Sequence, residues 1–325
     1  MTSESTQPHR YQAYGLRLGS KVPFPEMNSS RLPLDTGALD MEFAMVDEIA
    51  WSNSGTIVLE TSQSDDSNWL TCRRTGDGYT FHFPELADYF SDSNGQRILG
   101  VARSGIPPES TRHLFLDQVV PLLLNLRGME CLHASAIQTA RGVCAFLGRS
   151  GQGKSTLAAA FHAAGFPVIC DDCLLIKEHS DCIAVEPTYP GLRLWDDSRE
   201  VIFGSALSTS RVCHYTSKQR ISTPDVTMEN ASPRRLLRIY SLQLQGDSGP
   251  GELPIIESFS ARDAFMELFA YAFRLDLTDK AMILRQMHVL ERVVTEIPVK
   301  RLLVPENFEH LPVIRNLILN DLAQG

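Results

Sequence analysis

One short segment constrains the fold of this chain more than any other: a glycine-rich octapeptide between an apolar stretch and a helical stretch. It matches the pattern G-x-x-x-x-G-K-[ST] in full and reads Gly148-Arg149-Ser150-Gly151-Gln152-Gly153-Lys154-Ser155. The apolar residues 142–147 before it predict a strand, and residues 155–164 after it predict a helix. A strand, a phosphate-binding loop and a helix in this order predict a P-loop α/β fold.

The chemistry that this loop predicts is the binding of a nucleoside triphosphate. Glycines let successive backbone N–H groups point at phosphate oxygens, at the positive end of the following helix. Lys154 would place a positive charge beside the β- and γ-phosphates, and the Ser155 hydroxyl would bind Mg²⁺. The alternative, a glycine-rich turn with an accidental lysine, is disfavoured by the complete pattern and by its neighbours.

Two adjacent aspartates follow the next apolar segment. Residues 166–170 predict a short strand that ends at Asp171 and Asp172. Because ligands of α/β sheets gather at the carboxyl ends of parallel strands, we expect both carboxylates near the P-loop. One would hold Mg²⁺ and the other would accept a proton from an attacking hydroxyl, and the alternative is a solvated turn. Cys170 and Cys173 form a C-x-x-C pattern with no second pair at matching spacing, so we expect them to serve in packing.

The residues around the P-loop resemble the catalytic domain of the HPr kinase/phosphorylase family, which phosphorylates a serine on a carrier protein of the bacterial sugar phosphotransferase system. The resemblance rests on CLHAS at residues 131–135, GRSGQGKST at 148–156 and VICDDCLLI at 168–176. His133 lies 21 residues before Lys154, and Asp171 lies 17 residues after it. The resemblance implies that residues 148–156, through Thr156, bind ATP. It implies that Ser155 and Asp172 bind Mg²⁺, and that Asp171 is the general base with support from His133.

A second signature of that family, a glutamate-arginine-arginine-glycine stretch for the phosphorylase activity and a metal contact, is absent. VEPTYPGLRLW, residues 185–195, stands in its approximate place, where Glu186 would supply the missing carboxylate. We therefore expect a forward kinase without the reverse reaction. Arg193 alternates with leucines on a predicted strand, so it would reach the active edge of the sheet. Arg193 and Lys218 are the candidates to contact phosphate or substrate, and a solvated strand face is the alternative for each.

The chain outside the P-loop region resembles the HPr-kinase-related proteins found beside genes for ribosomally made peptides, including lasso peptides. This resemblance rests on Tyr14-Gly15-Leu16, on residues 22–25 and 189–195, and on residues 305–308 near the C-terminus. It implies that the acceptor is a serine of a precursor peptide.

Short strands separated by Gly, Asn, Asp, Ser and Pro predict a mainly antiparallel β domain over residues 1–105, with its first strand at 14–18. Residues 106–325 predict an HPr-kinase-like P-loop catalytic domain with a mixed sheet and C-terminal helices, so the fold class is α/β. We expect Ser110 to cap a helix that Pro121 kinks. Near the C-terminus two apolar stripes predict packed helices, at 265, 268, 269, 272 and 273 and at 283, 287, 290 and 294.

Composition and charge argue against some classes of partner. The formal charge of −9 argues against a general nucleic-acid binder, and no stretch of roughly 20 apolar residues predicts a membrane span. The N-terminus shows no secretory signal, and seven cysteines in apolar runs predict buried thiols, so we expect a cytoplasmic protein. The sequence does not determine whether the chain forms a homo-oligomer. The leading hypothesis is a kinase for a peptide or protein serine; the alternatives are a small-molecule kinase, a nucleotide-gated regulatory protein and, disfavoured, a phosphorylase.

Overall fold

The chain divides into two units. The computed structural model describes residues 9–49, 54–62, 67–205, 209–223, 234–245 and 253–324. Unit 1 contains residues 1–129, 213–215 and 273–285, and unit 2 contains residues 130–212, 216–272 and 286–325. Strands and helices occur together throughout, which confirms the α/β class. The expected domain boundary after residue 105 stays a prediction, and residues 106–129 make their contacts within unit 1.

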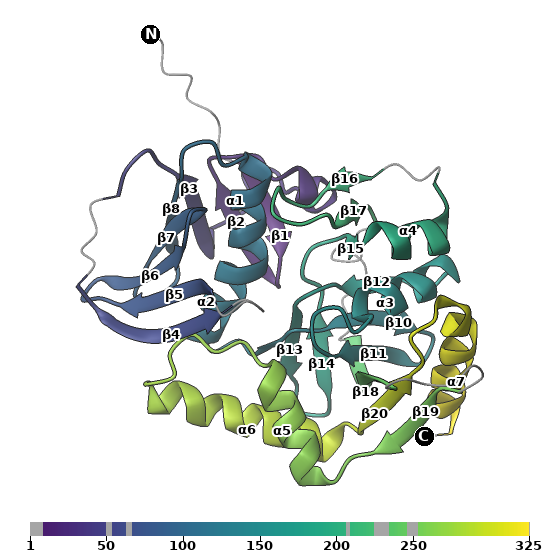
Figure 1. Ribbon diagram of the computed structural model, residues 1–325. Coiled ribbons are helices and arrows are strands. Elements are labelled where there is room, and N and C mark those ends of the chain that lie inside the picture. The colour runs from purple at the N-terminus through teal and green to yellow at the C-terminus, as the bar shows by residue number, and fades with distance from the viewer. Residues whose placement is uncertain are drawn as a thin grey trace. The chain divides into compact units, whose positions relative to one another are not determined.

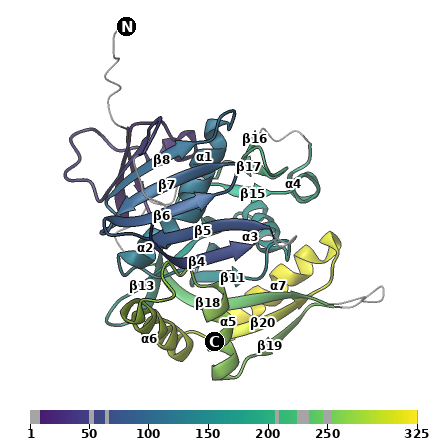
Figure 2. The same cartoon turned by 60° about the vertical axis from the view of Figure 1, so that its left-hand side comes forward.

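Unit 1 is built on one eight-stranded sheet with the order β1-β2-β3-β8-β7-β6-β5-β4, most of which is seen face-on in Figure 2. The strands are β1 (His9–Ala13), β2 (Leu16–Ser20), β3 (Met41–Met45), β4 (Thr56–Ser62), β5 (Asn68–Arg74), β6 (Gly78–Phe83), β7 (Ala87–Asp92) and β8 (Arg97–Ala102). Five of the pairings are antiparallel, as expected. The sheet is nevertheless mixed, because β3 runs parallel to both β2 and β8.

The expected strand at residues 14–18 is wrong in its first half. Tyr14 and Gly15 both have positive φ, 57° and 67°, and form the turn of the β1–β2 hairpin. A tyrosine seldom adopts this conformation, so Tyr14 is an unusual residue for a turn. The Tyr14 hydroxyl donates a hydrogen bond to the carbonyl of Leu116 at 2.7 Å, which ties the turn to a helical segment of the same unit.

That helical segment differs from the expectation at its start and in its middle. α1 (Pro108–Leu114) begins after Pro107, and the Ser110 hydroxyl pairs with Nδ1 of His214 at 2.7 Å instead of capping the helix. A π-helical turn, η2 (Phe115–Val119), joins α1 to α2 (Val120–Leu126). Pro121 lies in the first turn of α2. Because proline has no N–H, one helical hydrogen bond is not made there, and the expected irregularity takes the form of the π-helical turn before α2.

Unit 2 contains the P-loop and a nine-stranded mixed sheet with the path β12-β10-β11-β18-β14-β13-β9. β20 pairs with β18, and β19 pairs with β20. The strands are β9 (Cys131–Leu132), β10 (Ser135–Thr139), β11 (Gly142–Leu147), β12 (Val168–Cys170), β13 (Leu174–Glu178), β14 (Ile183–Glu186), β18 (Arg234–Leu244), β19 (Ile255–Ser258) and β20 (Val299–Val304). A smaller sheet joins β15 (Leu192–Leu194), β17 (Gln219–Ile221) and β16 (Ser210–Arg211).

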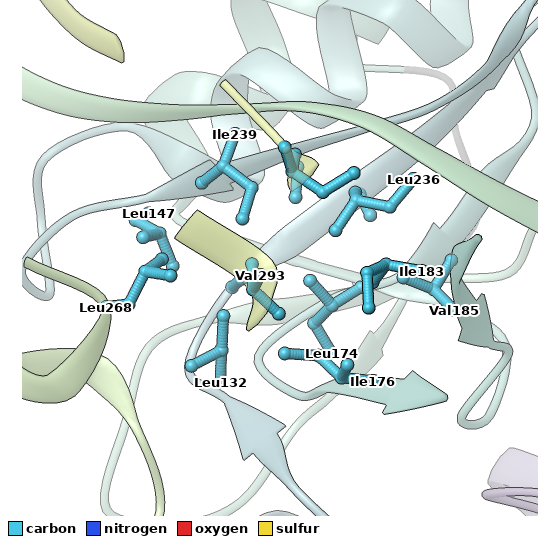
Figure 3. Packing of buried hydrophobic residues seen from close by; sticks show 14 of the residues in the cluster. Leu132, Leu147, Leu174, Ile176, Ile183, Val185, Leu236, Ile239, Leu268 and Val293 are labelled. Carbon is cyan, nitrogen blue, oxygen red and sulfur yellow. The ribbon is translucent and has the colours of Figure 1, made fainter. Parts of the chain in front are cut away.

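Helices cover both faces of the larger sheet (Figure 1). They are α3 (Lys154–Ala163), α4 (Asp196–Phe203), α5 (Ala261–Tyr271), α6 (Lys280–Glu296) and α7 (Leu311–Ala323). Successive side chains of β11 point to opposite faces of the sheet, so they pack in two different cores. Val143 and Leu147 pack with residues of α5 and α6, and Phe146 packs with residues of α3 and α7. Figure 3 shows the first of these cores, where Leu147 and Leu268 approach Val293.

The two C-terminal stripes lie on helices and are confirmed in part. On α5, Leu268 is buried and Phe265 and Phe269 pack against the core, but the helix ends at Tyr271, so residues 272 and 273 follow it. On α6, Leu290 is buried and Val294 packs against the core, whereas Met287 is 40% exposed and Val289 and Val293 are buried instead. No helix in the described part of the chain combines the length and apolar character needed to cross a bilayer. All seven cysteines are free and buried, as expected from their apolar neighbours.

Candidate functional site

The predicted strand, loop and helix occur in that order as β11, residues 148–153 and α3. Gly151 and Gly153 have φ values of 86° and 90°, and Gly153 is the N-cap of α3. A side chain at either position would meet no atom within 4 Å, so backbone conformation and not crowding requires glycine there. The N–H of Arg149 donates to the Gln152 side-chain oxygen at 2.5 Å, which closes the loop on itself. Arg149, Ser150 and Gly151 are exposed at its tip.

Lys154 lies across the base of this loop. Its ammonium donates to the carbonyls of Gly148 at 2.8 Å and Arg149 at 3.3 Å, and the residue is buried. Burial lowers the pKa of Lys154, while the charges of Asp172 and Asp171 act in the opposite direction. The lysine is therefore held between the loop and the acidic pair, where its charge can act on phosphate groups.

Asp171 follows β12 and collects hydrogen bonds from three elements. Its Oδ1 accepts bonds from the hydroxyls of Ser135 at 2.6 Å and Ser155 at 2.8 Å. Its Oδ2 accepts the backbone N–H of Arg193 at 2.9 Å. Burial, followed by the charge of Asp172, raises the pKa of the Asp171 carboxyl. β12 runs in the same direction as β11, with antiparallel β10 between them, so both strands end at one edge of the sheet.

Asp172 and His133 form the next part of the site. Asp172 has a φ of 69°, a conformation that is uncommon for a residue other than glycine. The Nδ1–H of His133 donates to the backbone carbonyl of Asp172 at 3.0 Å, and the N–H of His133 donates to the carbonyl of Tyr271 at 2.7 Å. Burial, and then the charge of Lys154, lowers the pKa of His133, which favours the neutral ring. His133 therefore supports the backbone of the acidic turn.

Arg193 reaches the aspartates from β15, as its alternation with two buried leucines predicts. Its Nη1 donates to the Asp171 carbonyl at 2.9 Å and lies 3.8 Å and 3.7 Å from the carboxylates of Asp171 and Asp172. The guanidinium carbon is 4.6 Å from the centre of the Tyr189 ring. Arg193 is 1% exposed, so in this structure it holds the acidic turn. A contact with phosphate or substrate stays a prediction.

Lys218 belongs to the same group of charges. It precedes β17, and its ammonium lies 5.5 Å from the centre of the Trp195 ring. Its positive charge is among the influences that lower the pKa of His133, after burial and the charge of Lys154. The structure thus brings together His133, Lys154, Asp171, Arg193 and Lys218, which are scattered over more than eighty positions of the sequence.

Glu186 and Thr156 form hydrogen bonds with residues outside the group around Asp171. Glu186, at the end of β14, accepts a hydrogen bond from Lys177 at 2.9 Å. The Thr156 hydroxyl donates to the Ser198 hydroxyl at 3.1 Å and so links α3 to α4. The expected metal contact of Glu186 and nucleotide contact of Thr156 stay predictions.

The oxygen atoms beside the P-loop suit a hard cation. The Ser155 hydroxyl and the Asp171 carboxylate lie in contact, and Mg²⁺ prefers oxygen ligands together with substrate phosphates. Among the described residues, no group of three or more His, Cys, Asp and Glu side chains is arranged to hold a metal ion by itself. A Mg²⁺ ion here would therefore depend on phosphate oxygens and water as well as on the protein.

Ser135 is the site residue that sequence reasoning did not single out. It stands in the HAS segment beside His133, but a serine on an apolar strand carries no signal of its own. Only the pairing of β10 with β12 brings its hydroxyl to Asp171.

Unit 1 has a shallow cavity of about 420 Å³, lined among others by Arg127 and Arg285. Its arginines already donate to backbone carbonyls, Arg127 to Asp40 and Arg285 to Asn125, and none of the predicted site residues lines it. This cavity has no part in the site described above.

Comparisons with known proteins add little to this geometry. No family model matches the sequence. No curated protein matches it either. Among solved structures, the chain is similar to the Hpr(Ser) kinase/phosphatase from Coxiella burnetii, with 12% identity over 60% of this chain and 97% of that chain and a TM-score of 0.30. A similarity of this degree supports no conclusion about fold or function.

Proposed function

We propose that this chain is a kinase that transfers the γ-phosphoryl group of ATP to a serine hydroxyl of a peptide or protein. The observation that carries the proposal is the contact between Ser155, the last residue of the P-loop pattern, and Asp171 at 2.8 Å. A P-loop hydroxyl in contact with a buried carboxylate is the arrangement that P-loop nucleotide enzymes use to hold Mg²⁺.

The chain's residues divide the work of phosphoryl transfer, which is mainly positioning and charge neutralisation. The loop amides and Lys154 would bind the phosphates, with Lys154 turning from the loop carbonyls to the γ-phosphate. Ser155 and one aspartate of the pair would hold Mg²⁺, which would neutralise phosphate charge. The other aspartate would accept the proton of the attacking hydroxyl. Arg193 and His133 hold the backbone of this turn in place.

The resemblance to kinases of ribosomal peptide biosynthesis makes a serine of a lasso-type precursor peptide the acceptor to test first. The test is incubation with γ-labelled ATP, Mg²⁺, and synthetic serine peptides or precursor peptides. Label on a peptide serine is the expected result. Label on a small metabolite alone would point to the small-molecule alternative. Tight ATP binding without any transfer would point to a nucleotide-gated regulatory protein, and either outcome would overturn the proposal.

A further inference from the structure

Arg193 has a neighbour of the same charge across the small sheet. Arg220, on β17, pairs in register with Arg193 on β15, and both guanidinium groups lie over the ring of Tyr189. Their carbons are 4.6 Å from the ring centre for Arg193 and 5.5 Å for Arg220. We propose that Arg220 binds a carboxylate of the acceptor peptide, so that the chain prefers acidic peptides. The inference rests on the proposed transfer of phosphate to a peptide and adds the class of acceptor.

The described part of unit 2 buries three arginines, which differ in their partners. Nη1 of Arg193 lies 3.8 Å and 3.7 Å from the carboxylates of the acidic pair, and Nη1 of Arg238 lies 2.8 Å from Asp321. Arg220 is 8% exposed, as is Arg238, but it forms no ion pair with a carboxylate of the described residues. Arg220 is therefore a buried cation whose charge no neighbouring carboxylate in that part of the chain balances.

Arg220 also has an unused hydrogen-bond donor. Its Nη1 is buried, and none of the described residues supplies an acceptor for it. The hydroxyl of Thr188, the residue before Tyr189, is likewise buried with no hydrogen-bond partner in the described ranges. Burying an unpaired charge is unfavourable, and the like charge of Arg193 directly across the sheet adds to the cost. A ligand that brought an anionic oxygen to Arg220 would remove both costs.

The backbone keeps room beside this guanidinium. Gly191 precedes β15 with a φ of 114°, a conformation that residues with a side chain rarely adopt. A side chain there would begin 3.5 Å from Nη1 of Arg220. The N–H of Gly191 donates to the hydroxyl of Thr223 at 2.9 Å, which holds the turn in place. The volume next to Nη1 is therefore not taken by a side chain of this turn.

The order of the strands places Arg220 on the acceptor side of the site. β15 is an edge strand of the small sheet, with β17 on one side. The backbone N–H of Arg193 donates to Asp171, so Asp171 lies beside the other edge of β15. Asp171 and Arg220 are thus two strand spacings apart, roughly 10 Å, which is the length of about three extended residues. The phosphates of ATP already have the P-loop and Lys154.

An acceptor peptide with its serine at the acidic pair would therefore bring a group about three residues away to Arg220. Arginine suits a carboxylate there, because its planar guanidinium can donate to both carboxylate oxygens. The carboxylate could belong to an acidic side chain or to the C-terminus of the acceptor, and the peptides used in the test separate these two sources.

The experiment compares the wild-type chain with R220M and R220K on serine peptides that differ only in charge. One amidated peptide is neutral, others carry an aspartate or a lysine three residues before or after the serine, and one ends in a free carboxylate three residues after it. The kcat/KM of the wild-type chain should be about tenfold or more higher for a carboxylate peptide than for the neutral one, as expected for a hydrogen bond between charged groups. R220M should reduce this ratio to below about twofold, and R220K should restore part of it.

The peptides identify the source of the carboxylate. A gain with aspartate assigns Arg220 to an acidic side chain, and a gain with the free terminus alone assigns it to the end of the acceptor. In either case the gain must disappear in R220M, because that variant removes the charge and keeps a side chain of similar length.

Arg238→Met is the matched control, because Arg238 is equally buried but paired with Asp321. It should leave the peptide ratio unchanged and lower the melting temperature, because it removes one partner of an ion pair. R220M should melt close to the wild-type chain, because an apolar side chain in place of a buried charge is often neutral or stabilising. If R220M does not fold, R220Q, which keeps a donor without the charge, replaces it.

Three results would overturn the inference. The first is a wild-type chain that treats neutral and acidic peptides alike. The second is an R220M variant that keeps the wild-type ratio. The third is an R220M variant that loses ATP affinity and slows equally on every peptide, since Arg220 would then act on the nucleotide or on the fold.

Peptide binding separates this inference from the proposed function. The affinity of each peptide, measured beside a non-hydrolysable ATP analogue, does not depend on transfer. If the wild-type chain labels no serine but binds a carboxylate peptide more tightly than the neutral one, and R220M does not, the kinase proposal fails and the site at Arg220 stands. If the chain labels serine peptides without regard to charge, the kinase proposal stands and this inference fails.

Discussion

Two acidic clusters in unit 2 show how the same residue types serve different ends. Asp321 on α7 accepts hydrogen bonds from Arg238 at 2.8 Å, Tyr240 at 2.8 Å and Lys300 at 2.5 Å. Burial opposes its ionisation, but these donors outweigh burial and lower the pKa of the carboxyl. At Asp171, burial and the adjacent Asp172 outweigh Arg193, and the pKa is raised.

The difference lies in how charge is balanced. Arg238 and Lys300 both form ion pairs with the single carboxylate of Asp321, so the ionised form of Asp321 stabilises the fold. At the other cluster Arg193 lies within 4 Å of two carboxylates. The charges of Arg193 and Lys218 do not outweigh burial and the charge of Asp172, so the pKa of the Asp171 carboxyl stays raised. Carboxyl groups with a pKa perturbed in this way occur often at functional sites.

The largest expected effect is a difference between the two clusters in ATP binding and phosphate transfer. Lys154→Ala should weaken ATP binding and slow transfer by about a hundredfold or more, because it removes the cation nearest the phosphates. Lys300→Ala, which removes the lysine bound to Asp321, is the matched control and should leave ATP affinity within about twofold. Calorimetric titration with ATP and the labelled-phosphate assay measure both. Equal losses in the two variants would mean that the clusters do not differ in function.

The second effect is on stability. Asp321→Asn should lower the free energy of unfolding by about 2 kcal/mol, because hydrogen bonds to charged groups contribute more than neutral ones. Asp171→Asn should lower it by about 1–3 kcal/mol for a different reason: the amide NH₂ cannot accept the hydrogen bond that one carboxylate oxygen accepts in the wild-type chain. Urea unfolding at pH 7 measures both values. An Asp171→Asn variant as stable as the wild-type chain would contradict this prediction.

The third effect is the pH dependence of the Asp321 cluster. A carboxyl whose pKa is lower in the folded than in the unfolded chain stabilises the fold above its unfolded pKa of about 3.9. That contribution disappears as the pH falls through the folded pKa. The stability difference between the wild-type chain and Asp321→Asn should therefore be constant from pH 7 to 5 and shrink below about pH 4. A difference that grew on acidification would show that Asp321 does not stabilise the fold as the ionised form.

The smallest expected effect concerns the loop beside the acidic pair. Gly153→Ala places a side chain at a φ of 90° and should cost about 1–2 kcal/mol, seen as a lower melting temperature and weaker ATP binding. Gly76→Ala is the control, because a side chain there would also meet no atom within 4 Å and no left-handed conformation is required. If both substitutions behave alike, the conformation of Gly153 is unimportant for the loop.

Local patterns in the sequence were sufficient to predict some elements of the structure and insufficient for others. The P-loop could be predicted because its glycines, Lys154 and Ser155 are neighbours, and the flanking strand and helix have clear patterns. The hairpin turn at Tyr14 and the exposure of Met287 on α6 could not be predicted, because tertiary contacts override local preference there. Ser135 gained a place in the site only through strand pairing.

The sequence by itself determined the α/β class, the position of the glycine-rich loop between β11 and α3, and the pair of carboxylates that follows β12, because each depends on residues close together in the chain. Tertiary structure alone decided how the two carboxylates differ. Burial and hydrogen-bond donors come from Ser135, Ser155 and Arg193 on three separate elements, and they surround Asp171 while leaving Asp172 partly exposed. Two identical neighbours in sequence thus acquire different chemistry, because solvation and charge are properties of the assembled fold.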